Sequence, residues 1–130
     1  MSLMGQLPPS IHECDSALEI LRAVLHRVNG RCSISKFREL MDKEAVKHYG
    51  MFLQFFVQGR TNPAFDRVMV TLRHSGQVIE YQDGTFEVTP ILKGETGLLA
   101  FNQFTRAQQS RFEFIARELM ESKPLVPANI

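Results

Sequence analysis

The sequence predicts a mainly α-helical domain that carries one small antiparallel β-hairpin. Apolar residues recur at spacings of three and four over most of the chain, as they do on one face of a helix. After Gly76 the spacing changes to alternate residues, as in half-buried strands. These strands flank Asp83-Gly84, a dipeptide typical of tight hairpin turns.

Two helices are expected before residue 43. The first begins at Ser10, which forms a capping-box pattern with Glu13, and it ends at Asn29-Gly30. After a short extended piece at 31–34, Ser35 is the expected N-cap of the second helix. The inward residues are Ala17, Ile20, Leu21, Val24 and Val28 in the first helix and Phe37, Leu40 and Met41 in the second.

A third helix is expected from about Lys43 to Gln58, ending at Gly59. It would be apolar on much of its circumference, so it needs cover on more than one side. That cover could come from the last helix or from a second subunit.

Two more helices have clear start signals. Asn62 suits an N-cap and Pro63 the first position of a helix that runs to about Ser75, with Phe65, Val68, Met69 and Leu72 inward. Thr105 and Gln108 form a capping-box pattern that opens the last helix, which ends at Lys123-Pro124.

The hairpin is expected to have a two-residue turn at Asp83-Gly84. Tyr81 would then face Phe86, and Ile79 would face Val88, which gives one apolar face. The other face would set Glu80 opposite Glu87, an unfavourable pair of like charges.

Length and composition fit one soluble domain. The chain has 130 residues, of which 44% are hydrophobic and 22% charged. We expect a single domain over 10–123, between a disordered N-terminus (1–9) and a flexible tail (124–130). No apolar run approaches the ~20 residues that span a bilayer, and the only cysteines, Cys14 and Cys32, form no close pair. These features predict a cytoplasmic protein, nuclear in a eukaryote, without membrane contact.

Basic residues are concentrated in one part of the chain. Between Ile20 and His74 there are ten basic residues against four acidic ones, although the net charge of the whole chain is only +1. Such an asymmetry can create a local positive field, and it can equally belong to a solvated helical surface.

The element order resembles that of the winged helix-turn-helix superfamily. The resemblance runs from Pro63 to Leu99 and centres on residues 72–80 and 83–90, which look like the end of a recognition helix, a glycine turn and a wing. Gly94 would be the glycine that follows Thr89-Pro90 in many such domains, although the spacing here is longer. The resemblance implies a winged helix followed by a C-terminal helix. The helix expected at 43–58 departs from this pattern, because many such domains have only a turn there. It would be an extra helix inserted for assembly, unless the chain has fewer helices than expected.

The resemblance also implies that the helix from Pro63 to Ser75 enters the major groove of double-stranded DNA. Arg, Asn and Thr side chains read base edges and phosphates. The candidate DNA-binding residues are therefore Lys36, Arg38, Arg60, Thr61, Asn62, Arg67, Thr71 and Arg73. The alternative is that Thr61 and Asn62 only cap the helix and that the arginines only solvate it.

The predicted wing favours a protein partner instead of DNA. Its tip carries Gln82, Asp83 and Thr85, with Glu80 and Glu87 behind them, and a polyanion would be repelled by such a surface. A winged-helix adaptor that binds another protein is therefore the alternative function.

Enzymatic chemistry is not predicted. His12, His26, His48 and His74 occur singly, without the pairing of zinc sites, and no phosphate-binding glycine loop or Gly-x-Ser-x-Gly turn is present. We therefore expect no catalytic residues, no metal and no cofactor.

Phenylalanine is abundant for a small domain without tryptophan. Phe52, Phe55, Phe56 and Phe112 could form a homodimer interface on the third and last helices, or they could fill the core. We predict a homodimer.

Overall fold

The computed structural model describes residues 11–47, 56–57, 60–61 and 63–121. This part of the chain is mainly helical and contains a small three-stranded antiparallel sheet. Its helices are α1 (Ile11–Leu25), α2 (Ile34–Lys47), α3 (Pro63–His74), α4 (Gly97–Asn102) and α5 (Arg106–Glu121), with a π-helical turn, η3 (Leu92–Thr96), before α4. The sheet is formed by β1 (Arg31–Ser33), β4 (Val78–Glu80) and β5 (Thr85–Val88), while β2 (Phe56–Val57) pairs separately with β3 (Arg60–Thr61).

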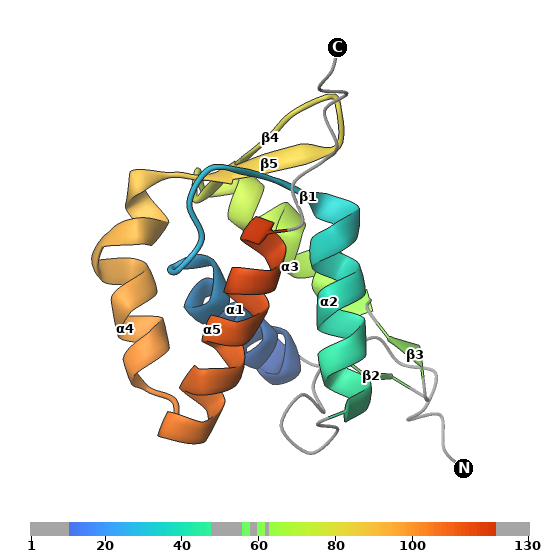
Figure 1. The fold of residues 1–130 in the computed structure, drawn as a ribbon, viewed down its shortest axis with the longest axis vertical. Coiled ribbons are helices and arrows are strands. Elements are labelled where there is room, and N and C mark those ends of the chain that lie inside the picture. Colours follow the sequence, from blue (N-terminus) through green and yellow to red (C-terminus); the bar gives the residue numbers. More distant parts are fainter. Residues whose placement is uncertain (1–10, 48–55, 58–59, 62, 122–130) are drawn as a thin grey trace.

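Helix α1 lies at the centre of the molecule. It packs against α3, α4 and α5, and Figure 1 shows it behind α5, between α2 and α4. Its expected stripe of five apolar residues is buried, from Ala17 through Val24 to Val28 just beyond the helix. The periodicity of this segment therefore predicted its inward face correctly.

The sheet lies across one end of the helices (Figure 1). Its strand order is β1–β5–β4, so the expected hairpin gains a third strand from the extended piece after α1. Phe86 on β5 stacks on Phe37 of α2 at a centroid distance of 5.7 Å, and Phe37 meets Phe65 of α3 edge-on at 5.1 Å. These three buried rings join the sheet to both helices.

The hairpin register differs from the prediction by one residue. Glu80 pairs with Phe86 and Ile79 with Glu87, and the Tyr81 N–H donates to the Thr85 carbonyl at 2.9 Å. The loop therefore has three residues and ends at Gly84, whose φ of 86° suits the left-handed position of such a loop. A shift of one residue turns a strand over, so Ile79 faces solvent while Val78, Phe86 and Val88 face the core.

The separate helix predicted from Lys43 to Gln58 is wrong. Residues 43–47 are the last part of α2, and Phe56 and Val57 form β2, antiparallel to β3. Aromatic and β-branched residues such as Phe56 and Val57 favour strands. Residues 48–55 lie outside the described part of the chain.

The helix starts are partly as predicted. Pro63 is the first residue of α3. Thr105 and Gln108 form the expected capping box, because each side chain accepts a hydrogen bond from the other residue's backbone N–H, at 2.9 and 3.2 Å. At α2, however, the cap is Ser33 and not Ser35: the hydroxyl of Ser33 accepts from the Lys36 N–H at 3.2 Å. The Ser10 capping box lies outside the described residues.

Candidate nucleic-acid interface

Helix α3 has one buried face and one exposed face. Phe65, Val68, Met69 and Leu72 are buried, as predicted, and they point toward α1 and the sheet. The opposite face is exposed and carries Asp66, Arg67, Val70, Thr71, Arg73 and His74. The side of the predicted recognition helix that faces away from the core is therefore open to solvent.

The C-terminal end of α3 is fixed by a dense set of hydrogen bonds. Gly76 adopts a φ of 75°, and the N–H groups of Gln77 and Gly76 donate to the carbonyls of Leu72 and Arg73 at 2.9 and 3.1 Å. This pattern is a Schellman motif. The Thr89 hydroxyl after β5 donates to the Gly76 carbonyl at 2.7 Å, so the hairpin β4–β5, which is the predicted wing, is tied to the end of α3.

A buried polar side chain links this turn to α1. Gln77 accepts a hydrogen bond from Arg22 at 2.9 Å and donates to the hydroxyl of Ser75 at 2.7 Å. Arg22 also pairs with Glu19 at 2.7 Å. Because the amide of Gln77 is satisfied on both sides, it can be buried without a large desolvation penalty, and it sets the position of α3 against α1.

The two predicted bases on α2 point in different directions. Arg38 forms a two-pronged ion pair with Asp66 of α3, one contact of which is 2.9 Å long, and its guanidinium lies 5.5 Å from the Phe65 ring centroid. Lys36 instead lies 3.7 Å from Glu39 and lines a groove toward α5. The ammonium groups of Lys43 and then Lys36 hold the pKa of Glu39 below its ordinary value.

On α3 itself, Arg73 and Arg67 differ in their contacts. Arg73 donates to Glu80 of β4 at 2.6 Å, across the junction of helix and wing. Arg67 is exposed and forms no ion pair with any residue whose side chain the structure describes. Thr71 is exposed, and its backbone carbonyl accepts from the hydroxyl of Ser75 at 2.8 Å.

The other three predicted DNA-binding residues, Arg60, Thr61 and Asn62, lie just before α3. Arg60 and Thr61 form β3, which precedes α3, but only their backbone is described. Asn62 lies outside the described residues. Their role in binding stays a prediction.

Arg31 is a residue that sequence reasoning did not assign to the site. It lies on β1, and its guanidinium is 3.7 Å from the centroid of the Tyr81 ring and 3.2 Å from the Asp83 carboxylate. It also donates to the Thr85 hydroxyl at 3.1 Å. The pairing of Arg31 with Glu87 in the register places it there, and no local motif in the sequence indicates that pairing.

The acidic wing is therefore largely engaged with groups of its own chain. Asp83 faces Arg31, Glu80 faces Arg73, and Glu87 accepts a hydrogen bond from the Tyr81 hydroxyl at 2.8 Å. This last bond raises the pKa of Tyr81. Two of the three wing carboxylates thus have an arginine beside them, which reduces the negative field expected from the sequence.

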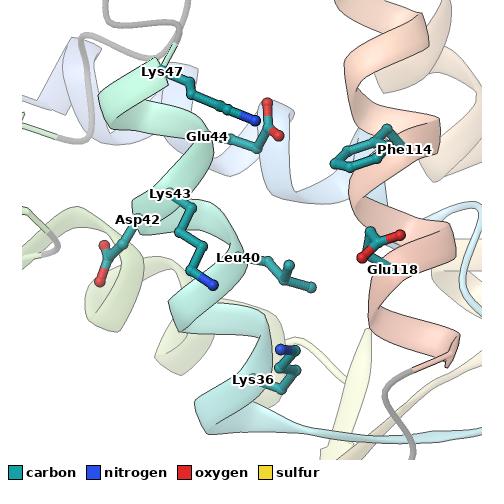
Figure 2. Close-up of a pocket in the computed structure, with 8 residues that line it drawn as sticks. All are labelled: Lys36, Leu40, Asp42, Lys43, Glu44, Lys47, Phe114 and Glu118. Carbon is teal, nitrogen blue, oxygen red and sulfur yellow. The ribbon is translucent and has the colours of Figure 1, made fainter.

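A groove of about 490 Å³ lies between α2 and α5 (Figure 2). Its α2 side carries Lys36, Leu40, Asp42, Lys43, Glu44 and Lys47, and its α5 side carries Phe114 and Glu118. Three basic and three acidic side chains surround the two apolar ones, Leu40 and Phe114, so the groove is not selective for one sign of charge.

Phe112 fills the core of its own chain. It is fully buried and meets Phe104 edge-on at 4.9 Å. Its ring is therefore not exposed to a partner, contrary to the expected interface role. Phe52 and Phe55 lie outside the described residues, and Phe56 is described by its backbone only. Dimer formation through these three residues stays a prediction.

No group of three or more His, Cys, Asp or Glu side chains that could hold a metal ion occurs among the described residues. In the same part of the chain, every helix is too short or too polar to cross a membrane.

No protein-family model matches this chain, and the comparisons with curated proteins and with solved structures gave no match either.

Proposed function

We propose that this chain is a winged helix-turn-helix protein that binds double-stranded DNA through the exposed face of α3. The observation that carries the proposal is the orientation of α3: its buried stripe faces α1 and the sheet, and its opposite face offers Arg67, Val70, Thr71 and His74 to solvent. A helix of 12 residues presented in this way has the size and polarity to lie in a major groove.

The topology supports the winged-helix part of the proposal. Three helices, α1 to α3, precede the hairpin β4–β5, and α1 and α2 flank the short strand β1 that completes the sheet. The β2–β3 pair, which precedes α3, would be an addition to the winged-helix motif. Because fold alone does not fix function, the DNA-binding part depends on the side chains of α3.

The ion pairs at the margin of α3 are compatible with DNA binding. Arg38 and Arg73 are both about two-fifths exposed, and the carboxylates of their partners, Asp66 and Glu80, are 61% and 26% exposed. Exposed pairs of this kind contribute only about 0–1 kcal/mol to stability. Each arginine can therefore exchange its carboxylate for a phosphate with little loss of folding free energy.

The experiment is a fluorescence anisotropy titration of a labelled random-sequence duplex at two salt concentrations. We expect binding that weakens at least tenfold between about 50 and about 200 mM salt, because counterions are released from the phosphates. Arg67→Ala should weaken binding about fivefold or more. Arg106→Ala removes the same charge from an exposed position at the start of α5 and should leave binding nearly unchanged.

Absence of binding at about 50 mM salt would overturn the proposal, as would equal losses in the two arginine variants. A second candidate function would then take precedence: a winged-helix adaptor for a protein partner. The pairing of Arg38 with Asp66 and of Arg73 with Glu80 favours it, because both signs of charge are present on one exposed surface.

A further inference from the structure

Val70 occupies the middle of the exposed face of α3. Successive residues of a helix are separated by about 100°, so the centre of the exposed face lies opposite the stripe of Phe65, Val68, Met69 and Leu72. Arg67, Val70 and His74 fall closest to that line. Val70 is the large apolar member of the line, and it is 43% exposed.

We propose that Val70 reads thymine by packing its methyl groups against the C5-methyl group in the major groove. This inference rests on the proposed function, because it assigns part of the sequence preference of the same helix. Thymine is the DNA base that carries a methyl group on the major-groove edge, and apolar contact with that group is one of the ways in which bases are read directly.

The neighbours of Val70 leave this contact open. On one side of the helix, Asp66 is held by Arg38 of α2, and Arg73 is held by Glu80 of the wing. Both pairs draw a charged side chain away from the centre of α3 and toward its flanking elements. On the other side Thr71 is short. An apolar contact is thus available between Arg67 and His74, which lie one turn before and one turn after Val70.

An exposed valine is by itself common on protein surfaces. The other large apolar side chains that are exposed in the described residues are Ile79, Ile91, Leu98 and Leu99, and none of them lies on α3. Leu98, on α4, is 44% exposed and therefore matches Val70 in accessibility. It provides the control for a general effect of removing exposed apolar surface.

The test begins with a random duplex pool from which the wild-type protein selects its preferred site. The selected duplex is then prepared with thymine, with uracil, and with 5-bromouracil, whose bromine replaces the methyl group with a substituent of similar size. Anisotropy titrations give the affinity for each. For the wild type we expect about fourfold weaker binding to the uracil duplex per contacted methyl group, and recovery with 5-bromouracil.

Val70→Ala should bind the thymine duplex about fourfold more weakly and should show almost no further loss with uracil. Leu98→Ala should keep the wild-type affinities and the wild-type ratio of thymine to uracil. A wild-type protein that binds all three duplexes equally, or a Val70→Ala variant that keeps the wild-type ratio, would overturn the inference alone. Failure to bind any duplex would overturn the proposed function, and this inference with it.

Discussion

Arg111 of α5 donates two hydrogen bonds to the carboxylate of Glu44 on α2, at 3.1 and 2.7 Å. The Glu44 side chain is only 4% exposed, whereas Arg111 is 28% exposed and its guanidinium lies 4.6 Å from the centroid of the Phe114 ring. Hydrogen bonds of this kind help to offset the desolvation of a nearly buried carboxylate. The pair therefore joins the two helices that border the groove of Figure 2.

Replacing Arg111 by alanine should destabilise the fold. The change removes the two hydrogen bonds that Arg111 donates to the buried Glu44 carboxylate. We expect a loss of about 2–3 kcal/mol, somewhat below the value for a fully buried pair because Arg111 is partly exposed. Urea unfolding measures the loss. Arg106→Ala is the control, with an expected change within about 0.5 kcal/mol. A loss below 1 kcal/mol in Arg111→Ala would show that the pair does not stabilise the α2–α5 contact.

Gly97 at the start of α4 should not tolerate a side chain. A Cβ atom there would lie 2.1 Å from the Leu92 carbonyl oxygen and 2.8 Å from the Cβ of His26. Both contacts are too short, so Gly97→Ala must shift α4 relative to Leu92 of η3 and to His26 just after α1, and we expect a loss of about 1–3 kcal/mol in thermal or urea unfolding. Ser110→Ala, at an exposed position of α5, should have little effect. Equal stabilities of the two variants would contradict the close approach of α4 and α1.

Acid should loosen the wing through Asp83. Its carboxylate accepts hydrogen bonds from the hydroxyl of Thr85 at 2.6 Å and from the Thr85 N–H at 3.0 Å, and these bonds hold its pKa below the ordinary value of about 3.9. Because the pKa is lower in the folded state, the stabilising contribution is present above pH ~3.9 and is lost as the pH falls through the folded pKa.

Removing the Thr85 hydroxyl tests this account directly. In Thr85→Val the pKa of Asp83 should rise toward its ordinary value, as measured by NMR titration of the carboxyl carbon. Thr71→Val changes an exposed threonine on α3 and should leave that pKa where it is in the wild type. If the two variants give the same Asp83 pKa, the hydrogen bond from Thr85 is not the main cause.

Neutralising Glu80 should strengthen DNA binding if the proposed function holds. Glu80→Gln removes the carboxylate that holds Arg73, so that arginine becomes free to contact a phosphate. We expect affinity for a random duplex to rise about two- to fivefold at low salt, measured by anisotropy, with a steeper dependence on salt. Glu121→Gln, at the end of α5, is the matched control. Weaker binding by Glu80→Gln would indicate that the ion pair itself holds the binding conformation.

Local patterns in the sequence were sufficient to predict most helices. The buried stripe of α1, the start of α3 at Pro63 and the capping box of α5 all depend on residues within one or two turns of each other. The segment after Lys43 was mispredicted because its structure depends on pairing with residues beyond the local pattern. Phe56 and Val57 are apolar in either a helix or a strand, and only their pairing with Thr61 and Arg60 distinguishes the two.

In the hairpin, one additional loop residue reverses which side chains of β4 face the core. The dipeptide Asp83-Gly84 predicted the position of the turn but not its length, and Gln82 proved to belong to the loop. As a result Ile79 is 47% exposed where an inward position was expected. Strand register depends on which face must be buried, and that depends on Phe37 and other residues far away in the sequence.

The sequence was sufficient to predict which side chains lie on the exposed face of α3. It was not sufficient to predict which charged groups pair with them. The positions of Arg67 and Thr71 on the exposed face of α3 follow from helical periodicity. The partners of Arg38 and Arg73, in contrast, come from other elements, and the contact of Arg31 with the wing requires the β1–β5 pairing. Sequence charge counts therefore overstated both the basicity of α3 and the acidity of the wing.

The position of Cys32 makes the thiol a natural reporter of how often the fold opens around the sheet. It is 2% exposed and pairs with Phe86 on the middle strand of the sheet, so a thiol reagent reaches it only when the packing around β1 opens. In a Cys14→Ala background, the labelling rate at Cys32 would measure the free energy of that opening under native conditions. Ligands that hold the wing in place should slow this labelling, so one unmodified residue can report binding events at a surface that it does not touch.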